Sequence, residues 1–139
     1  MSFTGAKLAL FLGQKLVVIL RDDKPDIPFP AFWDLPGGGR EGDESAKACA
    51  LRETHEEIGL ELEELDIVWA REYRGEAETS WFFAAHLPED EISKIQLGDE
   101  GQRWEMMTPE DYCAHPKAVP NFKLRLQEYL DAKSVEIWD

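Results

Sequence analysis

Three glutamates of this chain, Glu53, Glu56 and Glu57, have the spacing of one helix face. At about 100° per residue, positions i, i+3 and i+4 lie on the same side of a helix. Like charges at this spacing destabilise an isolated helix by roughly 0.2–0.5 kcal/mol per pair, and a merely solvated face would mix the two signs. Hard divalent cations such as Mg²⁺ take carboxylate oxygens as ligands. The cluster therefore predicts a metal site on a helix, with a solvated acidic face as the alternative.

The neighbours of these glutamates fit such a site. Arg52 lies four residues before Glu56, where it can orient that carboxylate through a charge-assisted hydrogen bond. Glu44 is nine residues before Glu53 and roughly half a turn out of phase with it, so we expect it to hold the loop or the helix start. The run Gly37-Gly38-Gly39 can bring the backbone close to a ligand and aim a carbonyl at a metal.

A longer pattern connects these features. Gly38, five residues, Glu44, seven residues and then Arg52-Glu53-Thr54-His55-Glu56-Glu57-Ile58-Gly59-Leu60 resemble the Nudix box, G-x5-E-x7-R-E-U-x-E-E-x-G-U, where U is a bulky apolar residue. Every fixed Gly, Glu and Arg is present; the single departure is Thr54 at the first apolar position, which concerns packing. The box covers 23 of the 139 residues. The segment Trp33-Asp34-Leu35-Pro36-Gly37-Gly38 is also similar to small MutT-like members of the family.

The resemblance implies a fold and a ligand set. The fold would be an α/β/α sandwich with a mixed β-sheet between helices. Glu53 and Glu57 would be the leading metal ligands, Glu56 a ligand or base, and a backbone carbonyl of Gly37 or Gly38 a further ligand. Arg52 would orient a glutamate. The cation would be Mg²⁺, with Mn²⁺ as the alternative.

The resemblance also implies a reaction, the cation-dependent hydrolysis of the pyrophosphate linkage in a nucleoside diphosphate joined to a second group. The first substrate expected is a nucleoside triphosphate, an oxidised one included. ADP-ribose, nucleotide sugars and dinucleoside polyphosphates are the alternatives, because the box specifies the diphosphate chemistry only. A non-catalytic Nudix-fold module that binds nucleotides is the alternative from another class.

The charge of the chain is strongly acidic and unevenly distributed. Twenty-nine acidic against fifteen basic residues give a net charge of −14. Residues 40–66 hold ten acids and three bases, and residues 89–111 hold eight acids and two bases. This charge repels polyanions and predicts neither a nucleic-acid polymer nor an anionic membrane as partner. A small nucleotide would need a bridging cation.

The second acidic window contains a glycine-flanked loop, Gly98-Asp99-Glu100-Gly101, before a predicted strand. Family members commonly supply one more carboxylate from a loop outside the box. We therefore expect Glu100 to join the metal site and to serve catalysis, with Asp99 as second choice and a solvated loop as the alternative.

Residues that could bind the organic part of a substrate are less distinctive. Asn121, just before the last predicted helix, resembles a position from which some MutT-like enzymes read a purine, but we favour it as a helix N-cap. Five aromatic residues could stack on a base, although aromatic residues more often pack in a core: Phe29, Phe32, Trp33, Tyr73 and Trp81.

The elements that must position these residues follow from local patterns. Residues 7–12 and 15–20 predict a hairpin, residues 29–35 an edge strand at most, residues 66–74 and 79–86 two further strands, and residues 103–107 a short one. Helices are predicted from Glu44 to Ile58, with Asp43 as N-cap and Gly59 after the end, at residues 109–113, and from Pro120 to about Ala132. These elements predict one α/β domain over residues 1–139.

Cys49 and Cys113 are far apart in the sequence and form no C-x-x-C pair. Together with the lack of a long apolar segment, they predict reduced thiols in the cytoplasm. The sequence leaves open whether the protein is a monomer or a homodimer.

Overall fold

The structure, a computed structural model, describes residues 2–138. Its elements along the chain are β1 (Gly5–Leu12), β2 (Lys15–Leu20), β3 (Trp33–Asp34), β4 (Gly37–Gly39), α1 (Ala46–Ile58), the 3₁₀ helix η1 (Glu64–Asp66), β5 (Ile67–Arg74), β6 (Thr79–Leu87), the 3₁₀ helix η2 (Glu89–Lys94), β7 (Arg103–Met107), α2 (Pro109–Ala114) and α3 (Pro120–Trp138).

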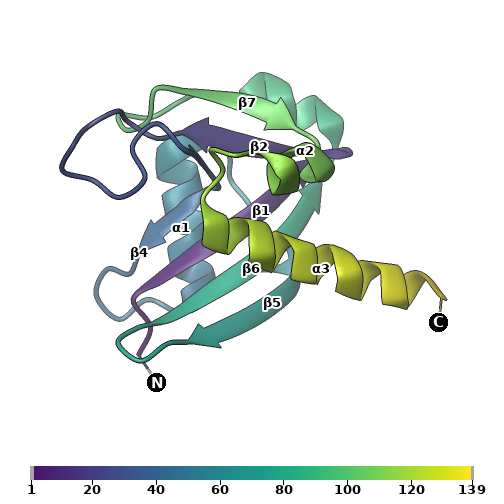
Figure 1. Cartoon of the computed structure of the whole chain (residues 1–139). Helices are drawn as coiled ribbons and strands as arrows, with labels where there is room; N and C mark the ends of the chain where they lie inside the picture. Colours follow the sequence, from purple (N-terminus) through teal and green to yellow (C-terminus); the bar gives the residue numbers. More distant parts are fainter. Residues whose placement is uncertain (1, 139) are drawn as a thin grey trace.

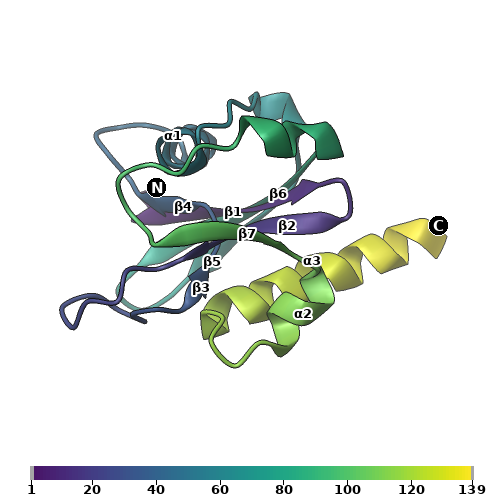
Figure 2. The same ribbon diagram turned by 90° about the horizontal axis from the view of Figure 1, so that it is seen from above.

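A single mixed sheet lies between helices. Helix α1 covers one face of the sheet, and α2 and α3 cover the other (Figures 1 and 2). The main strand order is β3-β2-β1-β6-β5, with β4 paired to β1 and β7 paired to β2. Strand β1 runs parallel to β6 and antiparallel to β2 and β4. The predicted α/β/α sandwich with a mixed sheet is confirmed.

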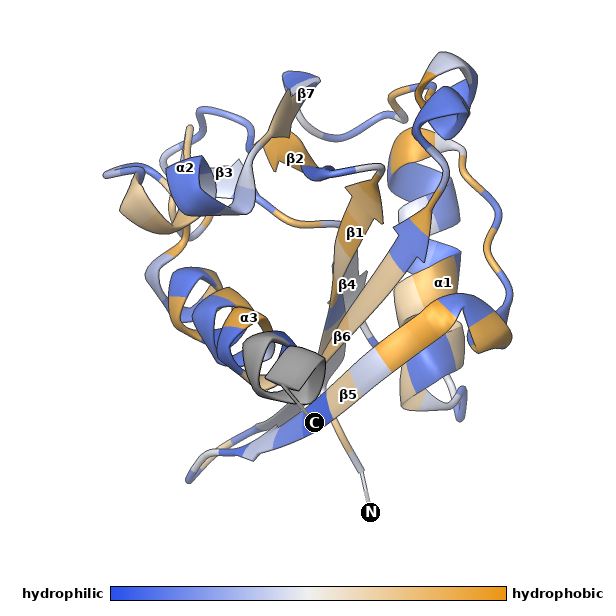
Figure 3. Cartoon of the chain, turned by 90° about the vertical axis from the view of Figure 1, so that its right-hand side faces the viewer, coloured by the Kyte–Doolittle hydropathy of each residue, from blue (hydrophilic) through white to orange (hydrophobic). Residues whose placement is uncertain are grey.

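The central strands are buried on both faces, which explains their nearly continuous apolar sequence. Leu8, Leu10 and Leu12 of β1 belong to the core under α1, and the alternate residues Ala9 and Phe11 belong to the core under α3. Each fully buried leucine contributes roughly 1.5–3 kcal/mol. Figure 3 shows α1 and α3 on opposite sides of the strands, with hydrophobic colouring on β1, β2 and the first part of β5.

The predicted strands are confirmed. The hairpin β1–β2 turns at Gly13, which has a φ of 65°. Strand β3 is two residues long and ends the strand order, as the proline-broken segment predicted. Strands β5, β6 and β7 lie within one residue of their predicted bounds.

The predicted start of α1 is wrong by two residues. The N-cap is Ser45, whose Oγ accepts a hydrogen bond from the Ala48 N–H at 3.1 Å, and the helix begins at Ala46. Asp43 lies in a turn before it. The Glu44 carboxylate closes that turn by accepting from the Glu41 N–H at 2.8 Å, so the residues up to Glu44 stay outside the helix.

Three other parts of the chain can be compared with the predicted elements. Gly59 ends α1 in the left-handed region with a φ of 74°, as predicted. Residues 37–39, where the sequence predicts no strand, pair with β1 as the short strand β4. Helix α3 continues past Ala132 to Trp138, because an existing helix gains a backbone hydrogen bond with each added residue and needs no apolar face to continue.

Among residues 2–138, no helix combines the length and the apolar character needed to cross a bilayer. Cys49 and Cys113 are both free thiols.

Candidate metal centre and substrate groove

Helix α1 sorts its residues by face. Cys49, Ala50, Thr54 and Ile58 are buried against the sheet. At about 100° per residue Glu57 and Glu53 lie at this face or beside it and are half-buried, while Glu56 points away from it and is exposed. Thr54, the one departure from the Nudix box, fits the core because its hydroxyl donates to the Ala50 carbonyl at 2.7 Å. The departure concerns packing, as predicted.

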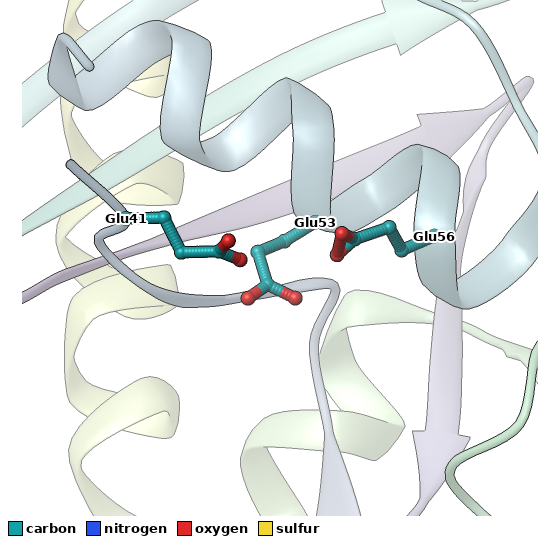
Figure 4. A group of neighbouring side chains, drawn as sticks. All are labelled: Glu41, Glu53 and Glu56. Carbon is teal, nitrogen blue, oxygen red and sulfur yellow. The ribbon is translucent and has the colours of Figure 1, made fainter.

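The structure brings three carboxylates together beside α1. One oxygen each from Glu41, Glu53 and Glu56 can be chosen so that all three lie within 4.8 Å of one another (Figure 4). Glu41 comes from the loop before α1 and was missed by sequence reasoning. Its only signal was an acidic residue inside the box, at a position where the box fixes no residue type.

Arg52 holds this group in place. Its guanidinium donates to both Glu44 oxygens, at 2.8 and 3.0 Å, and to both Glu56 oxygens, at 2.9 and 3.1 Å. It also donates to the Gly39 carbonyl at 2.9 Å and lies 2.8 Å from a Glu41 oxygen. The hydrogen bond from Arg52, followed by the one to Glu41, lowers the pKa of Glu44 to about 2. Arg52 orients Glu56 as predicted, and Glu44 holds the helix start.

Glu57 is not one of these three carboxylates; it contacts the glycine loop at Gly37. Its Oε1 accepts a hydrogen bond from the Gly37 N–H at 2.8 Å. Burial raises its pKa to about 7, against the lowering effects of Lys7 and of this hydrogen bond. Burial also raises the pKa of Glu53, and the charges of Glu56 and Glu100 add to the increase while Arg52 opposes it. Carboxyl groups with raised pKa values mark a place where a cation would stabilise the ionised form.

The glycines of the loop are needed for close approach. A Cβ on Gly38 would lie 2.5 Å from Glu53 Oε2, so the carboxylate rests directly on the backbone of that glycine. Gly37 has a φ of 129°, and a Cβ there would lie 2.7 Å from the Cα of Lys7. The carbonyl of Gly37 accepts from Lys7 Nζ at 2.9 Å, and that of Gly38 from the Cys49 thiol at 3.5 Å.

The acidic loop after η2 docks on the end of α1. The Gly98 N–H donates to the Glu57 carbonyl at 2.8 Å, and a Cβ on Gly98 would overlap the Glu56 carbonyl. Glu100 lines a cavity of about 220 Å³ together with Glu57 and Asp34. Asp99 and Glu100 are both exposed, but Asp99 does not line this cavity. The structure thus brings Glu100 to the glutamates of α1 and leaves Asp99 outside.

On the other side of the glycine loop lies a groove of about 550 Å³, which we call the substrate groove. Its lining includes Lys7, Gly38, Gly39, Trp81, Asn121 and Arg125. The preferred N-cap role of Asn121 is wrong, because α3 begins at Pro120 and Asn121 lies inside its first turn, exposed toward the groove.

Trp33 lies elsewhere. It is only 7% exposed, it packs in the core under α3, and its carbonyl accepts from the Tyr112 hydroxyl at 2.9 Å. Its burial favours the core role over base stacking. Trp81 is half-buried at the groove, where its ring stacks on that of Phe83 at 5.8 Å.

The donor set fits a hard divalent cation, because it consists of carboxylate and carbonyl oxygens. Cys49 offers no competing thiolate, since burial raises its pKa to about 11.

The fold and the site together define a class: α/β/α proteins in which a glycine loop and an acidic helix form one carboxylate centre. A model of the NUDIX domain matches residues 3–129. An RNA pyrophosphohydrolase of Cereibacter sphaeroides is 30% identical over 141 residues, covering 86% of this chain and 77% of that protein. The chain therefore belongs to the Nudix family.

Two further likenesses agree. An RNA pyrophosphohydrolase of Acidiphilium cryptum is 34% identical over 102 residues, covering 73% of this chain and 55% of that protein. A solved Nudix hydrolase from M. smegmatis superposes with a TM-score of 0.74 at 18% identity, covering 96% of this chain and 86% of that one. The chain spans about half the length of some curated relatives that it matches.

The names of these relatives are in tension with one expectation. The net charge predicted that no nucleic-acid polymer is a partner, yet these relatives are named for a reaction on RNA.

Proposed function

We propose that this protein is a Mg²⁺-dependent pyrophosphohydrolase of nucleoside polyphosphates, with a free nucleoside triphosphate as its first substrate and Mn²⁺ as the alternative cation. The observation that carries the proposal is that Gly38 belongs to both halves of the site. It lines the substrate groove, and Glu53 rests on its backbone. A nucleotide in the groove would thus place its phosphates beside the carboxylates.

The residues that would hold the cation are Glu53, Glu56 and Glu57 with a carbonyl of Gly37 or Gly38, joined by Glu100 and Glu41. A bound divalent cation neutralises phosphate charge and makes a water molecule more nucleophilic. Arg52 keeps Glu56 in one orientation, and Glu56 is 52% exposed at its side chain, so it can accept a proton from a water in the open site. Glu57 is the second candidate for that role.

The groove supplies contacts for the rest of the substrate. The Asn121 amide offers two donors and an acceptor to a base edge. Trp81 offers part of a ring face for stacking, and Arg125 and Lys7 offer positive charge to phosphates. The free thiols of Cys49 and Cys113 support a reducing compartment such as the cytoplasm. A single domain over residues 1–139, as a monomer or homodimer, completes the proposal.

The triphosphorylated 5′ end of an RNA is a second candidate substrate, and one structural observation favours it beside the names of the relatives. A hollow of about 660 Å³ continues from the groove through Ser80 and Arg125. Arg71, Arg74 and Arg125 line it together with Glu72 and Glu78, and Arg74 pairs with Glu72 at 2.7 Å, so the arginines exceed the acids by one in a chain with a net charge of −14. Such a surface could accept the phosphates of the following nucleotides, although the net charge opposes a long polyanion.

A substrate panel tests the proposal. Nucleoside triphosphates with normal and oxidised bases, ADP-ribose, nucleotide sugars, dinucleoside polyphosphates and a 5′-triphosphorylated RNA oligonucleotide are incubated with Mg²⁺, with Mn²⁺ and with EDTA. We expect metal-dependent release of pyrophosphate or phosphate, fastest from a triphosphate. If no compound is hydrolysed and one of them raises the melting temperature, the protein is a binding module and the proposed function is wrong.

A further inference from the structure

Lys7 is a cation outside the Nudix box, and it lies between the two halves of the site. It is the third residue of β1, where it pairs with Gly37 of β4. Its ammonium donates to the Gly37 carbonyl at 2.9 Å, to the Leu35 carbonyl at 3.2 Å and to Asp34 Oδ2 at 3.2 Å. An ammonium has three N–H groups, so these acceptors use all of them.

Gly37 is the residue that lets Lys7 reach this place. A Cβ on Gly37 would lie 2.7 Å from Lys7 Cα and 3.0 Å from Lys7 Cδ, so any other residue would displace the backbone of β1 together with the lysine side chain. The Gly37 residue is held at both ends, because its N–H donates to Glu57 and its carbonyl accepts from Lys7. Lys7 therefore bonds a carbonyl that is itself a candidate metal ligand.

Lys7 also borders the place where substrate would bind. Its side chain is 16% exposed and lines the substrate groove beside Gly38 and Asn121, and its Nζ lies 5.4 Å from the ring centroid of Phe122. Its charge acts on Glu53 and Glu57, lowering the pKa of each against the larger effect of burial. The Lys7 ammonium thus lowers the pKa values of the site's carboxyl groups, and the same side chain lines the substrate groove.

We propose that Lys7 is a substrate-binding residue whose ammonium holds the Gly37 carbonyl in the metal-free protein and turns to a substrate phosphate when that carbonyl is given to a divalent cation. The inference rests on the proposed function and names a residue that contacts the phosphates. It predicts two effects of opposite sign. The lysine competes with the metal, because two cations repel at short range, and it strengthens phosphate binding through a charge-assisted hydrogen bond.

The experiment separates these two effects. Mn²⁺ binding without any phosphate compound is titrated by electron paramagnetic resonance, and binding of inorganic pyrophosphate at saturating Mg²⁺ is measured by calorimetry. For Lys7→Met we expect Mn²⁺ affinity about threefold or more above wild type and pyrophosphate affinity about tenfold or more below it. Lys7→Arg should stay close to wild type in Mn²⁺ affinity. Lys15→Met, at an exposed lysine of the hairpin turn, is the matched control.

A role of Lys7 in folding alone would give a different result. The proposal is overturned if Lys7→Met binds Mn²⁺ more weakly than wild type, or if it binds Mn²⁺ and pyrophosphate as wild type does. It is also overturned if the wild-type protein does not bind pyrophosphate. The wild-type protein provides a second measurement, because the ¹³Cε resonance of Lys7 should shift on addition of Mg²⁺ and shift again on addition of pyrophosphate. A failed nucleotide panel with the expected Lys7 results would reject the proposed substrate and leave the role of Lys7 intact.

Discussion

The Glu53 carboxylate lies directly against the backbone of Gly38, where a Cβ would come within 2.5 Å of Oε2. The obstructing atoms are the far end of a flexible side chain, so an alanine at position 38 can be accommodated by moving Glu53. We therefore expect Gly38→Ala to fold but to lose Mn²⁺ affinity by about tenfold or more, the size of effect seen when a supporting contact of a metal ligand is lost.

Gly39→Ala is the control for this prediction. A Cβ on Gly39 meets nothing closer than the Thr4 carbonyl at 3.9 Å, so this variant should bind Mn²⁺ like wild type. Equal affinity of the two variants in the same titration would show that Glu53 does not bind the metal from its present position.

Glu57→Gln should lower Mg²⁺-dependent hydrolysis by about a hundredfold or more and leave the fold intact, because the residue serves the metal rather than the core. The pKa of Glu57 is raised to about 7, so in the metal-free protein its contribution to stability is present below pH 4.5 and is lost as the pH rises through about 7. The metal-free variant should therefore melt no lower than wild type at pH 8.

Phosphate-release assays and thermal melts of both proteins check these two expectations for Glu57. Glu61→Gln, at a side chain 86% exposed just after the same helix, is the control and should behave as wild type. Full activity of Glu57→Gln would remove this residue from the metal site.

Arg52→Gln should destabilise the protein by about 2 kcal/mol and also weaken metal binding, since it removes a partly exposed bidentate pair with Glu44 and frees Glu56. The lowered pKa of Glu44 adds stability that is present above pH 4.5 and is lost as the pH falls toward 2. Urea denaturation at several pH values should show that wild type loses stability as the pH falls. If the stability of Arg52→Gln fell with pH in the same way, Arg52 would not be the cause of the lowered pKa of Glu44.

Glu100→Gln should reduce Mn²⁺ affinity and hydrolysis by roughly tenfold, while Asp99→Asn changes neither. Glu100 lines the cavity shared with Glu57, and Asp99 does not. The same titrations and assays on the two loop variants check the difference. If Asp99→Asn lowered Mn²⁺ affinity and hydrolysis more than Glu100→Gln, Asp99 would replace Glu100 as the metal ligand from this loop.

His86 gives a pH effect far from the metal centre. Its Nε2 lies 2.7 Å from the Tyr129 hydroxyl, and its ring stacks on Phe11 with centroids 4.4 Å apart. Burial, followed by the charge of Lys133, lowers its pKa. Stability from the neutral ring is present above about pH 6.5 and is lost as the pH falls through the lower folded pKa. The stability difference between wild type and His86→Gln should therefore shrink on acidification, as measured by denaturant unfolding.

The parts of the fold and site that the sequence predicts are those with a local cause. The i, i+3 and i+4 spacing places Glu53, Glu56 and Glu57 on one helix, and the loop–helix order puts Gly38 beside them. The alternation of β1 residues between two cores also follows from local pattern. These features need no knowledge of which strand pairs with which.

The residues that the sequence does not reveal reach the site through tertiary structure. Lys7 comes from β1 through its pairing with Gly37, and Asp34 meets it from β3. Glu41 joins the carboxylates because Arg52 draws its side chain toward α1. The start of α1 was also predicted wrongly, because the Glu44 side chain satisfies a backbone N–H of its own loop and delays the helix.

The parallel pairing of β1 with β6 has a consequence for the order of folding. Residues 5–12 lie beside residues 80–87, about 75 positions further along the chain. During synthesis β1 leaves the ribosome long before β6, and local elements such as the β1–β2 hairpin and α1 can form early. The pairing that completes the centre of the sheet must await β6, and long-range closure of this kind is slow. The glycine loop and the acidic helix lie in the intervening stretch, so they are synthesised before β6, whose Phe83 and Ala85 complete the core beneath α1.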